Sequence, residues 1–364
     1  MEFHELINHA VSTIHSNESN RKRLAGELAF LGTADLSVCA SPEVREFKMV
    51  FPCEPAALTG AVVGVDSGFV VKSLHSVDVV LVRAVGVCFL FQGGVLKSAE
   101  YEPGFFSFPK PFLFGGAVLD LHELEQSKSL VRLGEEIDLA TKMIRAKKPA
   151  FCLLDGSLIP QYADKPPKES GLTNAYHRVL SAFATLYRTA QENDCELVGC
   201  VEDSRGNRFA GILADSILPV FGKKPSGLDV VSDSVLLSHV LSPRQRSMAF
   251  SYTKNVSKHP ILNDLAPWGD KIFACYLRPS ALDRPLRIEF LHSQGDFSAH
   301  VDRVSHVIMA LASLHREYAY PSVLIEADLR ARLKPEEIDL VFNKITDKLS
   351  HNVALQLRRN SRPF

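Results

Sequence analysis

The chain has 364 residues, enough for one large domain or two moderate ones with a substantial apolar core. Its composition, 46% hydrophobic and 23% charged, is typical of a globular protein and excludes a disordered chain. The formal net charge of -1 excludes a uniformly polybasic nucleic-acid binder, so any positive potential must be confined to a groove or channel.

The seven cysteines are scattered along the chain, and none forms a C-x-x-C pair. This spacing speaks against a zinc module and a disulfide framework and predicts a reducing, cytoplasmic location. The first thirty residues mix both charges without a continuous apolar run, so we do not expect a signal peptide. The most apolar stretch, 77–91, is too short to span a bilayer and contains Asp78 and Arg83, so no membrane role is expected.

The N-terminal third is predicted to hold helices, a connector and strands. One or two helices are expected in the first thirty residues, and prolines predict a connector over 40–60. The run AVVGVDSG predicts a buried strand that stops at a turn beginning with Asp66. The valine-rich stretch 77–91 is long enough for two paired strands and is closed by Gly93 and Gly94.

The rest of the chain alternates helical and strand patterns. Residues 121–147 have a helical pattern, and the run AFCLLDGSL predicts a second buried strand that ends at Asp155. Further helices are expected at 174–193, 301–315 and 335–349, and further strands at 195–201, 272–276 and 286–290. This alternation predicts a mixed α/β sheet with flanking helices in one elaborated domain.

Two predicted strands end in an aspartate followed by small residues, at Asp66 and at Asp155. In open α/β sheets, ligands gather at the carboxyl ends of the strands. Two carboxylates there could share divalent cations, and their hard oxygen atoms suit Mg²⁺ or Mn²⁺. The alternative is that Asp-Ser and Asp-Gly are simply turn residues.

A third carboxylate is expected from the helix that precedes Asp155. An apolar stripe on this helix faces the sheet and contains Leu130, Leu133, Ile137, Ala140 and Ile144. At about 100° per residue, Glu136 lies on the flank of this stripe, whereas Glu135 points to solvent. Glu136 can therefore reach an internal site, although both acids could also be ordinary surface residues.

A series of motifs resembles the NurA nucleases, which act with the hexameric HerA DNA-translocating ATPase. The motifs keep the family's order over residues 60–331: GVDSG, EEIDLA, FCLLDGSL, LVGCVEDSRGNR, SDSVLLSHVLSPRQRS, ACYLRP and YPSVLIEADLRA. Each motif is moderately specific, and the ordered series is much more so.

The resemblance implies a ribonuclease-H-like core, a homodimer enclosing a DNA channel, and Mn²⁺- or Mg²⁺-dependent cleavage of DNA ends and single strands. It implies that Asp66, Glu136 and Asp155 bind the metal and that Tyr320 is the family's active-site tyrosine. The domain organisation expected is an N-terminal helical segment for dimer or partner contact (1–40), a NurA-like nuclease domain (41–350) and a basic tail (351–364).

Two positions depart from the family's pattern. Asp328 replaces a histidine, and a carboxylate can ligate a metal but cannot act as an imidazole donor. Glu202 replaces a lysine, which removes a candidate phosphate contact, and Arg205 could partly substitute for it in binding substrate. These changes motivate an alternative function, a catalytically weakened scaffold subunit of a DNA translocase complex.

Other features bear on DNA binding and on the need for a partner. Local basic clusters occur at 205–208, 223–224, 244–246, 330–334 and in the C-terminal tail, where they could line a DNA channel. The chain contains no Walker-type phosphate loop, so any motor must be supplied by a partner ATPase. A third hypothesis is an actin-like phosphotransferase, in which Asp66 would begin a phosphate loop.

Overall fold

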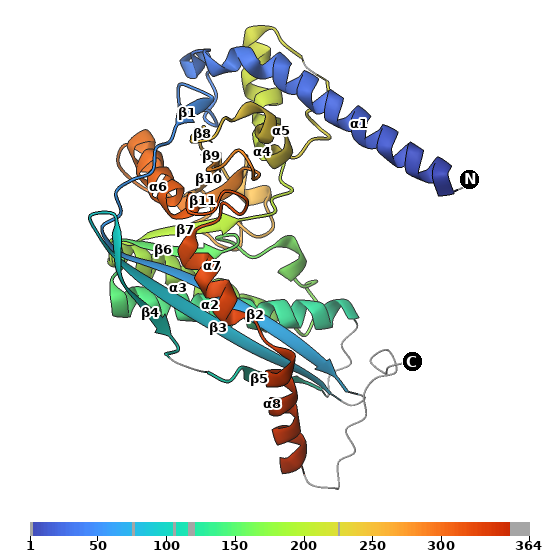
Figure 1. The fold of residues 1–364 in the computed structure, drawn as a ribbon, viewed down its shortest axis with the longest axis vertical. Coiled ribbons are helices and arrows are strands. Elements are labelled where there is room, and N and C mark those ends of the chain that lie inside the picture. The colour runs from blue at the N-terminus through green and yellow to red at the C-terminus, as the bar shows by residue number, and fades with distance from the viewer. Residues whose placement is uncertain (1–2, 75–76, 105–106, 116–120, 225, 350–364) are drawn as a thin grey trace. The chain divides into compact units, whose positions relative to one another are not determined.

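The computed structural model describes residues 3–74, 77–104, 107–115, 121–224 and 226–349 (Figure 1). The chain divides into two compact units. Unit 1 comprises Met1–Ala57, Cys200–Val256 and Asp270–Pro321, and unit 2 comprises Leu58–Gly199, Ser257–Gly269 and Ser322–Phe364. The basic tail expected at 351–364 lies outside the described residues, and the domain boundaries expected from the sequence stay predictions.

Unit 2 is built on a mixed sheet whose strands lie in the order β7-β6-β2-β3-β4, with β5 also paired to β3. The bounds are β2 (Gly60–Ser73), β3 (Asp78–Gln92), β4 (Val95–Glu102), β5 (Lys110–Phe114), β6 (Phe151–Asp155) and β7 (Glu196–Val201). β2, β3 and β4 form an antiparallel meander, and β6 lies parallel to β2 on its other side. A meander followed by a parallel strand reached through a helix is the ribonuclease-H-like arrangement.

Helices cover both faces of this sheet (Figure 1). They are α2 (Leu121–Lys147), α3 (Thr173–Glu192), α7 (Ser322–Ala331) and α8 (Pro335–Lys348). A Cβ atom added at Gly64 would lie 2.9 Å from the backbone oxygen of Val323 in α7, and one at Gly86 would lie 2.9 Å from Met143 in α2. Gly86 pairs with Val65, the residue that follows Gly64 in β2, and paired residues share a face of the sheet. Gly64 therefore faces α7, and Val65 faces α2. The two glycines let α7 and α2 approach the sheet closely.

Two predictions about these strands are wrong. The stretch 77–91 is one long strand rather than two, because β3 pairs along its whole length with β2 and then with β4. The strand that contains Asp66 does not stop there, since β2 continues to Ser73 in unbroken register with β3. Asp66 is therefore a mid-strand residue, which excludes a simple turn role and a phosphate loop that begins at this position.

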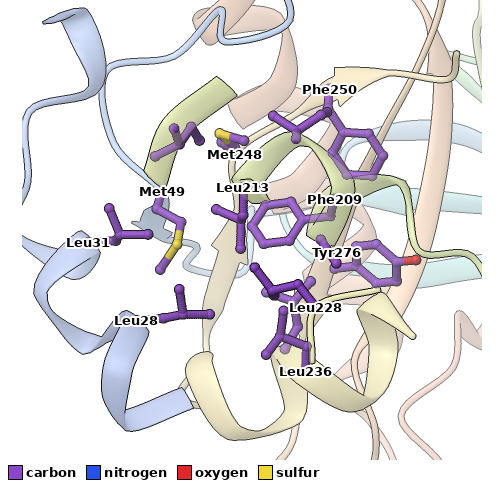
Figure 2. Packing of buried hydrophobic residues seen from close by; sticks show 14 of the residues in the cluster. Leu28, Leu31, Met49, Phe209, Leu213, Leu228, Leu236, Met248, Phe250 and Tyr276 are labelled. Carbon is purple, nitrogen blue, oxygen red and sulfur yellow. The ribbon is translucent and has the colours of Figure 1, made fainter. Parts of the chain in front are cut away.

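Unit 1 contains strands in the order β1-β8-β10-β11, with β9 paired to β10. The bounds are β1 (Val50–Pro52), β8 (Gln245–Ser247), β9 (Phe250–Ser251), β10 (Ile272–Arg278) and β11 (Leu286–Leu291). Its helices are α1 (Phe3–Leu28), α4 (Arg208–Ile212), α5 (Asp233–Val240) and α6 (Phe297–Ala312). Leu28 and Leu31 meet Met49, Phe209 and Leu213 in an apolar core (Figure 2).

None of the described helices of the chain is long and apolar enough to cross a membrane.

Part of the basic cluster at 244–246 lies inside the core of unit 1. The Arg246 side chain is fully buried, donates to both carboxylate oxygens of Glu46 and to Asp302, and lies 4.0 Å above the ring of Phe51. Breaking such a buried pair is costly, so this arginine is structural. The prediction that Arg246 contacts DNA phosphates is wrong, since the side chain is buried. A cluster of basic residues in a sequence does not reveal which of them are buried.

Candidate active site

Asp66 and Asp155 lie at neighbouring positions of adjacent parallel strands. The register pairs Val65 of β2 with Leu154 of β6, so the two aspartates are the next residues along each strand. Adjacent strands are about 4.8 Å apart, which places these two carboxylates side by side. β6 ends at Asp155, whereas β2 continues past Asp66. The buried carboxylate of Asp66 and the partly exposed carboxylate of Asp155 therefore lie next to each other in the sheet.

Asp66 faces α7, as Gly64 and Gly68 do, because residues two apart in a strand share a face. The residue is 7% exposed, and its Oδ1 atom accepts a hydrogen bond of 2.6 Å from the backbone nitrogen of Ser67. Asp328 of α7 is close enough for its charge to raise the pKa of Asp66. Asp328 is thus a fourth carboxylate near Asp66, Glu136 and Asp155.

The other face of β2 presents Ser67 to α2. The Ser67 hydroxyl donates to Oε2 of Glu136 in a short hydrogen bond. Arg132, one helical turn before Glu136, donates from Nη1 to the same oxygen at 2.9 Å and to the Ser67 hydroxyl oxygen at 3.1 Å. Ser67 therefore connects the two faces, since its backbone nitrogen binds Asp66 and its hydroxyl binds Glu136.

The two adjacent glutamates of α2 differ as the helical geometry predicts. Glu136 is buried, with 3% of its side chain exposed, and points inward to Ser67. The Glu135 side chain is 25% exposed and pairs with Lys110. Residues Leu130, Ile137, Ala140 and Ile144 of the predicted stripe are buried. The inward position of Glu136 follows from this packing.

The pKa values of the carboxylates show that the cluster holds unfavourable negative charge. Burial, followed by the nearby charges of Asp155 and Glu136, raises the pKa of Asp66 to about 8. Burial raises the pKa of Glu136 to about 7, against the opposing effects of Arg132 and Ser67. Raised pKa values of this kind are common at functional sites, where like charges are held together.

The donor set fits a divalent cation by its chemistry, because clustered carboxylates offer hard oxygen ligands and an excess of negative charge. Within the described parts of the chain, however, no three His, Cys, Asp or Glu side chains already converge on a common point. The contacts explain this, since Asp66 faces α7 while Glu136 is held on the α2 side by Arg132 and Ser67. Asp66, Glu136 and Asp155 are the residues that would hold metal ions.

A pocket of about 270 Å³ opens beside the cluster in unit 2. Its walls include Glu136 and Asp155 together with Arg132, Ser129 and Ser157. Neither Arg132 nor Ser67 was predicted from the sequence to be a ligand or substrate contact. Arg132 could have been found from its spacing of four residues before Glu136, because such pairs are neighbours on a helix surface.

Tyr320 belongs to unit 1, where its ring is buried and stacks with Tyr318. Its hydroxyl donates a hydrogen bond of 2.9 Å to the backbone oxygen of Cys200. A role as donor to a phosphate would require the hydroxyl to leave this carbonyl. Its catalytic role stays a prediction.

Arg205 is an exposed residue of unit 1, and it lines a pocket of about 480 Å³. The pocket is also lined by Ser232, Ser234, Ser238, Asp203 and Arg284, of which the last two form an ion pair. Among the residues that the structure describes, no carboxylate pairs with the Arg205 guanidinium. A guanidinium that has no carboxylate partner among the described residues and shares a pocket with several serine hydroxyls has the chemistry to bind a phosphate group.

Comparisons with known proteins agree with this geometry. The model of the NurA domain family matches residues 60–333. The fold is similar to that of the NurA nuclease from Sulfolobus solfataricus, with 14% identity, coverage of 84% of this chain and 88% of that one, and a TM-score of 0.53. It is also similar to another NurA structure, with 9% identity, coverage of 96% and 99%, and a TM-score of 0.54.

A third similar structure is that of a NurA bound to dAMP and manganese, with 10% identity, coverage of 82% of this chain and 90% of that one, and a TM-score of 0.50. No curated protein matches the chain by sequence. At these identities the structural likeness shows the fold alone. The predicted ribonuclease-H-like α/β fold and the predicted family resemblance are confirmed.

Proposed function

Since the chain belongs to the NurA family, we propose that it is a divalent-metal-dependent DNA nuclease that acts as an exonuclease and a single-strand endonuclease on DNA ends. The observation that carries this proposal is the cluster of Asp66, Glu136 and Asp155 beside an open pocket, in which burial and the nearby charge of Asp155 raise the pKa of both Asp66 and Glu136. The dAMP and manganese bound by the similar NurA structure support Mn²⁺, or Mg²⁺, as the cofactor and DNA as the substrate.

Each residue of the cluster has a distinct task in this proposal. A bound divalent cation supplies Lewis-acid stabilisation of the negative charge that develops on the scissile phosphate. Asp66 and Asp155 would hold the cation from the sheet and Glu136 would hold it from α2, while Asp328 of α7 would add negative charge beside Asp66. Ser67 orients Asp66 and Glu136 through its backbone nitrogen and its hydroxyl.

Cleavage of an end-labelled DNA strand during titration with Mn²⁺ tests this function. We expect product to accumulate with rising Mn²⁺ concentration and to disappear on addition of a chelator. A lack of cleavage at every Mn²⁺ and Mg²⁺ concentration would overturn the nuclease proposal and favour the scaffold subunit. The specific observations behind that alternative are the acidic residues at Glu202 and Asp328.

Arg205 is expected to bind a DNA phosphate without reading sequence. Arg205→Ala should weaken DNA binding about equally for unrelated sequences and reduce the slope of log affinity against log salt concentration by about 1. Fluorescence anisotropy over a salt series measures both quantities. Arg284→Ala is the matched control, because that arginine lines the same pocket but is already paired with Asp203. An unchanged salt slope in Arg205→Ala would remove this residue from the substrate site.

The partners proposed are a second copy of the chain and a HerA-like hexameric ATPase. Support comes from α1, whose N-terminal part exposes an apolar row: Phe3, Leu6, Ile7, Val11 and Ile14. Exposed apolar rows of this kind mark protein contacts. Light scattering of the chain alone and after mixing with the ATPase measures both associations, and a monomer that does not bind the ATPase would contradict them.

A further inference from the structure

Arg132 is the positively charged partner of the buried Glu136 carboxylate. Its Nη1 atom lies 2.9 Å from Oε2 of Glu136, and one quarter of its side chain remains exposed. The interaction partly offsets the cost of burying the Glu136 charge. A guanidinium that is both bound to a buried carboxylate and open to a pocket can exchange partners without crossing the protein core.

The charges of the adjoining pocket show why this arginine matters. Four acids line the pocket, namely Glu125, Glu136, Asp155 and Asp164. Arg132 is the single lysine or arginine among the described residues of its wall. An anionic phosphate would be repelled by this wall unless a positive charge were turned toward it. The guanidinium of Arg132 is the protein's own source of that charge.

We propose that Arg132 has two successive partners: Glu136 in the metal-free protein, and the substrate phosphate once Glu136 ligates a cation. This inference rests on the proposed nuclease function and adds a catalytic residue to it. The planar guanidinium can contact two phosphate oxygens at once, which a lysine cannot do. Arg132 would thereby bind the phosphate in the pocket beside Asp155 and stabilise the charge that develops on it.

The alternative is that Arg132 only positions Glu136. The two roles differ in their response to saturating Mn²⁺ in the Arg132→Gln variant. If Arg132 only positioned Glu136, the variant would bind Mn²⁺ more weakly and saturating Mn²⁺ would restore cleavage. If Arg132 binds phosphate, cleavage stays low at saturating Mn²⁺, because the missing contact is to the substrate.

Binding of dAMP, a phosphate ester that offers no internucleotide bond to cleave, provides a readout other than activity. At saturating Mn²⁺, isothermal titration calorimetry should show dAMP binding to Arg132→Gln about tenfold or more weakly than to the wild type, as expected for loss of a charge-assisted hydrogen bond. Arg132→Lys should recover part of the affinity, since it keeps the charge but not the planar fork.

Arg145→Gln is the matched control, because Arg145 lies on the same helix and bonds to Thr189 rather than to a carboxylate. It should match the wild type in Mn²⁺ binding, dAMP binding and cleavage. Full recovery of both dAMP binding and cleavage by Arg132→Gln at saturating Mn²⁺ would overturn the inference. A wild-type protein that neither binds Mn²⁺ nor cleaves DNA would instead overturn the proposed function on which it rests.

Discussion

Replacing Glu136 with glutamine is expected to lower Mn²⁺-dependent DNA cleavage by about a hundredfold or more, since a lost metal carboxylate removes several kcal/mol of transition-state stabilisation. The amide keeps the shape of the side chain and can still accept from Ser67. It lacks the negative charge that a divalent cation needs. Initial rates on a labelled strand at fixed Mn²⁺ concentration measure the effect.

The adjacent residue provides a matched control for this experiment. Glu135→Gln removes the same charge one position away on α2, but this side chain pairs with Lys110 and does not contact Ser67. We expect its cleavage rate to stay within about twofold of the wild type, as for a surface ion pair of little energetic weight. An equal loss of cleavage rate in both variants would mean that the substitutions act by destabilising α2, and that Glu136 is not a metal ligand.

Removing the charge of Asp66 should raise the thermal stability of the metal-free protein and reduce the stabilisation of the protein by Mn²⁺. In chelator at pH 8.5, above the pKa of about 8 for Asp66, the buried carboxylate of Asp66 is ionised and is repelled by the nearby charges of Asp155 and Glu136. Asp66→Asn relieves this repulsion, so we expect the Tm of the metal-free protein to rise by several degrees. Excess Mn²⁺ should stabilise the wild type by about 3 kcal/mol at one hundred times the Kd, and the variant far less.

Asp78→Asn controls for the loss of any buried aspartate from the sheet. Asp78 lies in β3, next to β2, and is also buried, but it takes no part in the cluster. Its variant should keep the full stabilisation by Mn²⁺ in differential scanning fluorimetry. If Mn²⁺ raised the Tm of Asp66→Asn as much as that of the wild type, Asp66 would not be a metal ligand.

Local patterns predicted much of the fold. The apolar stripe of α2 placed Glu136 inward, because helical periodicity is fixed by the backbone and the stripe must pack on the sheet. Most of the helices and strands that were predicted begin and end within a few residues of the expected positions, whereas shorter elements such as β5, β8 and α7 were not predicted. The exceptions are long strands: turn residues after Asp66 suggested an end, but continuous pairing with β3 overrides that local preference.

What the sequence did not predict depends on contacts between distant segments. The bridge from Ser67 to Glu136 joins residues 69 positions apart and requires the packing of α2 on β2. Asp66 and Glu136 lie on opposite faces of β2, and this arrangement follows from how the strand is oriented in the sheet, which short sequence motifs do not reveal. The burial of Arg246 against Glu46 likewise depends on a tertiary contact across 200 positions.

A crystal structure of the protein soaked in Mn²⁺, with the anomalous signal of manganese recorded, tests the central claim most directly. We expect an anomalous peak bounded by carboxylate oxygens of Asp66, Glu136 and Asp155 at about 2.0–2.2 Å, with Arg132 turned away from Glu136. Manganese bound elsewhere, or an unchanged Arg132–Glu136 pair with no peak between the three carboxylates, would contradict the assignment.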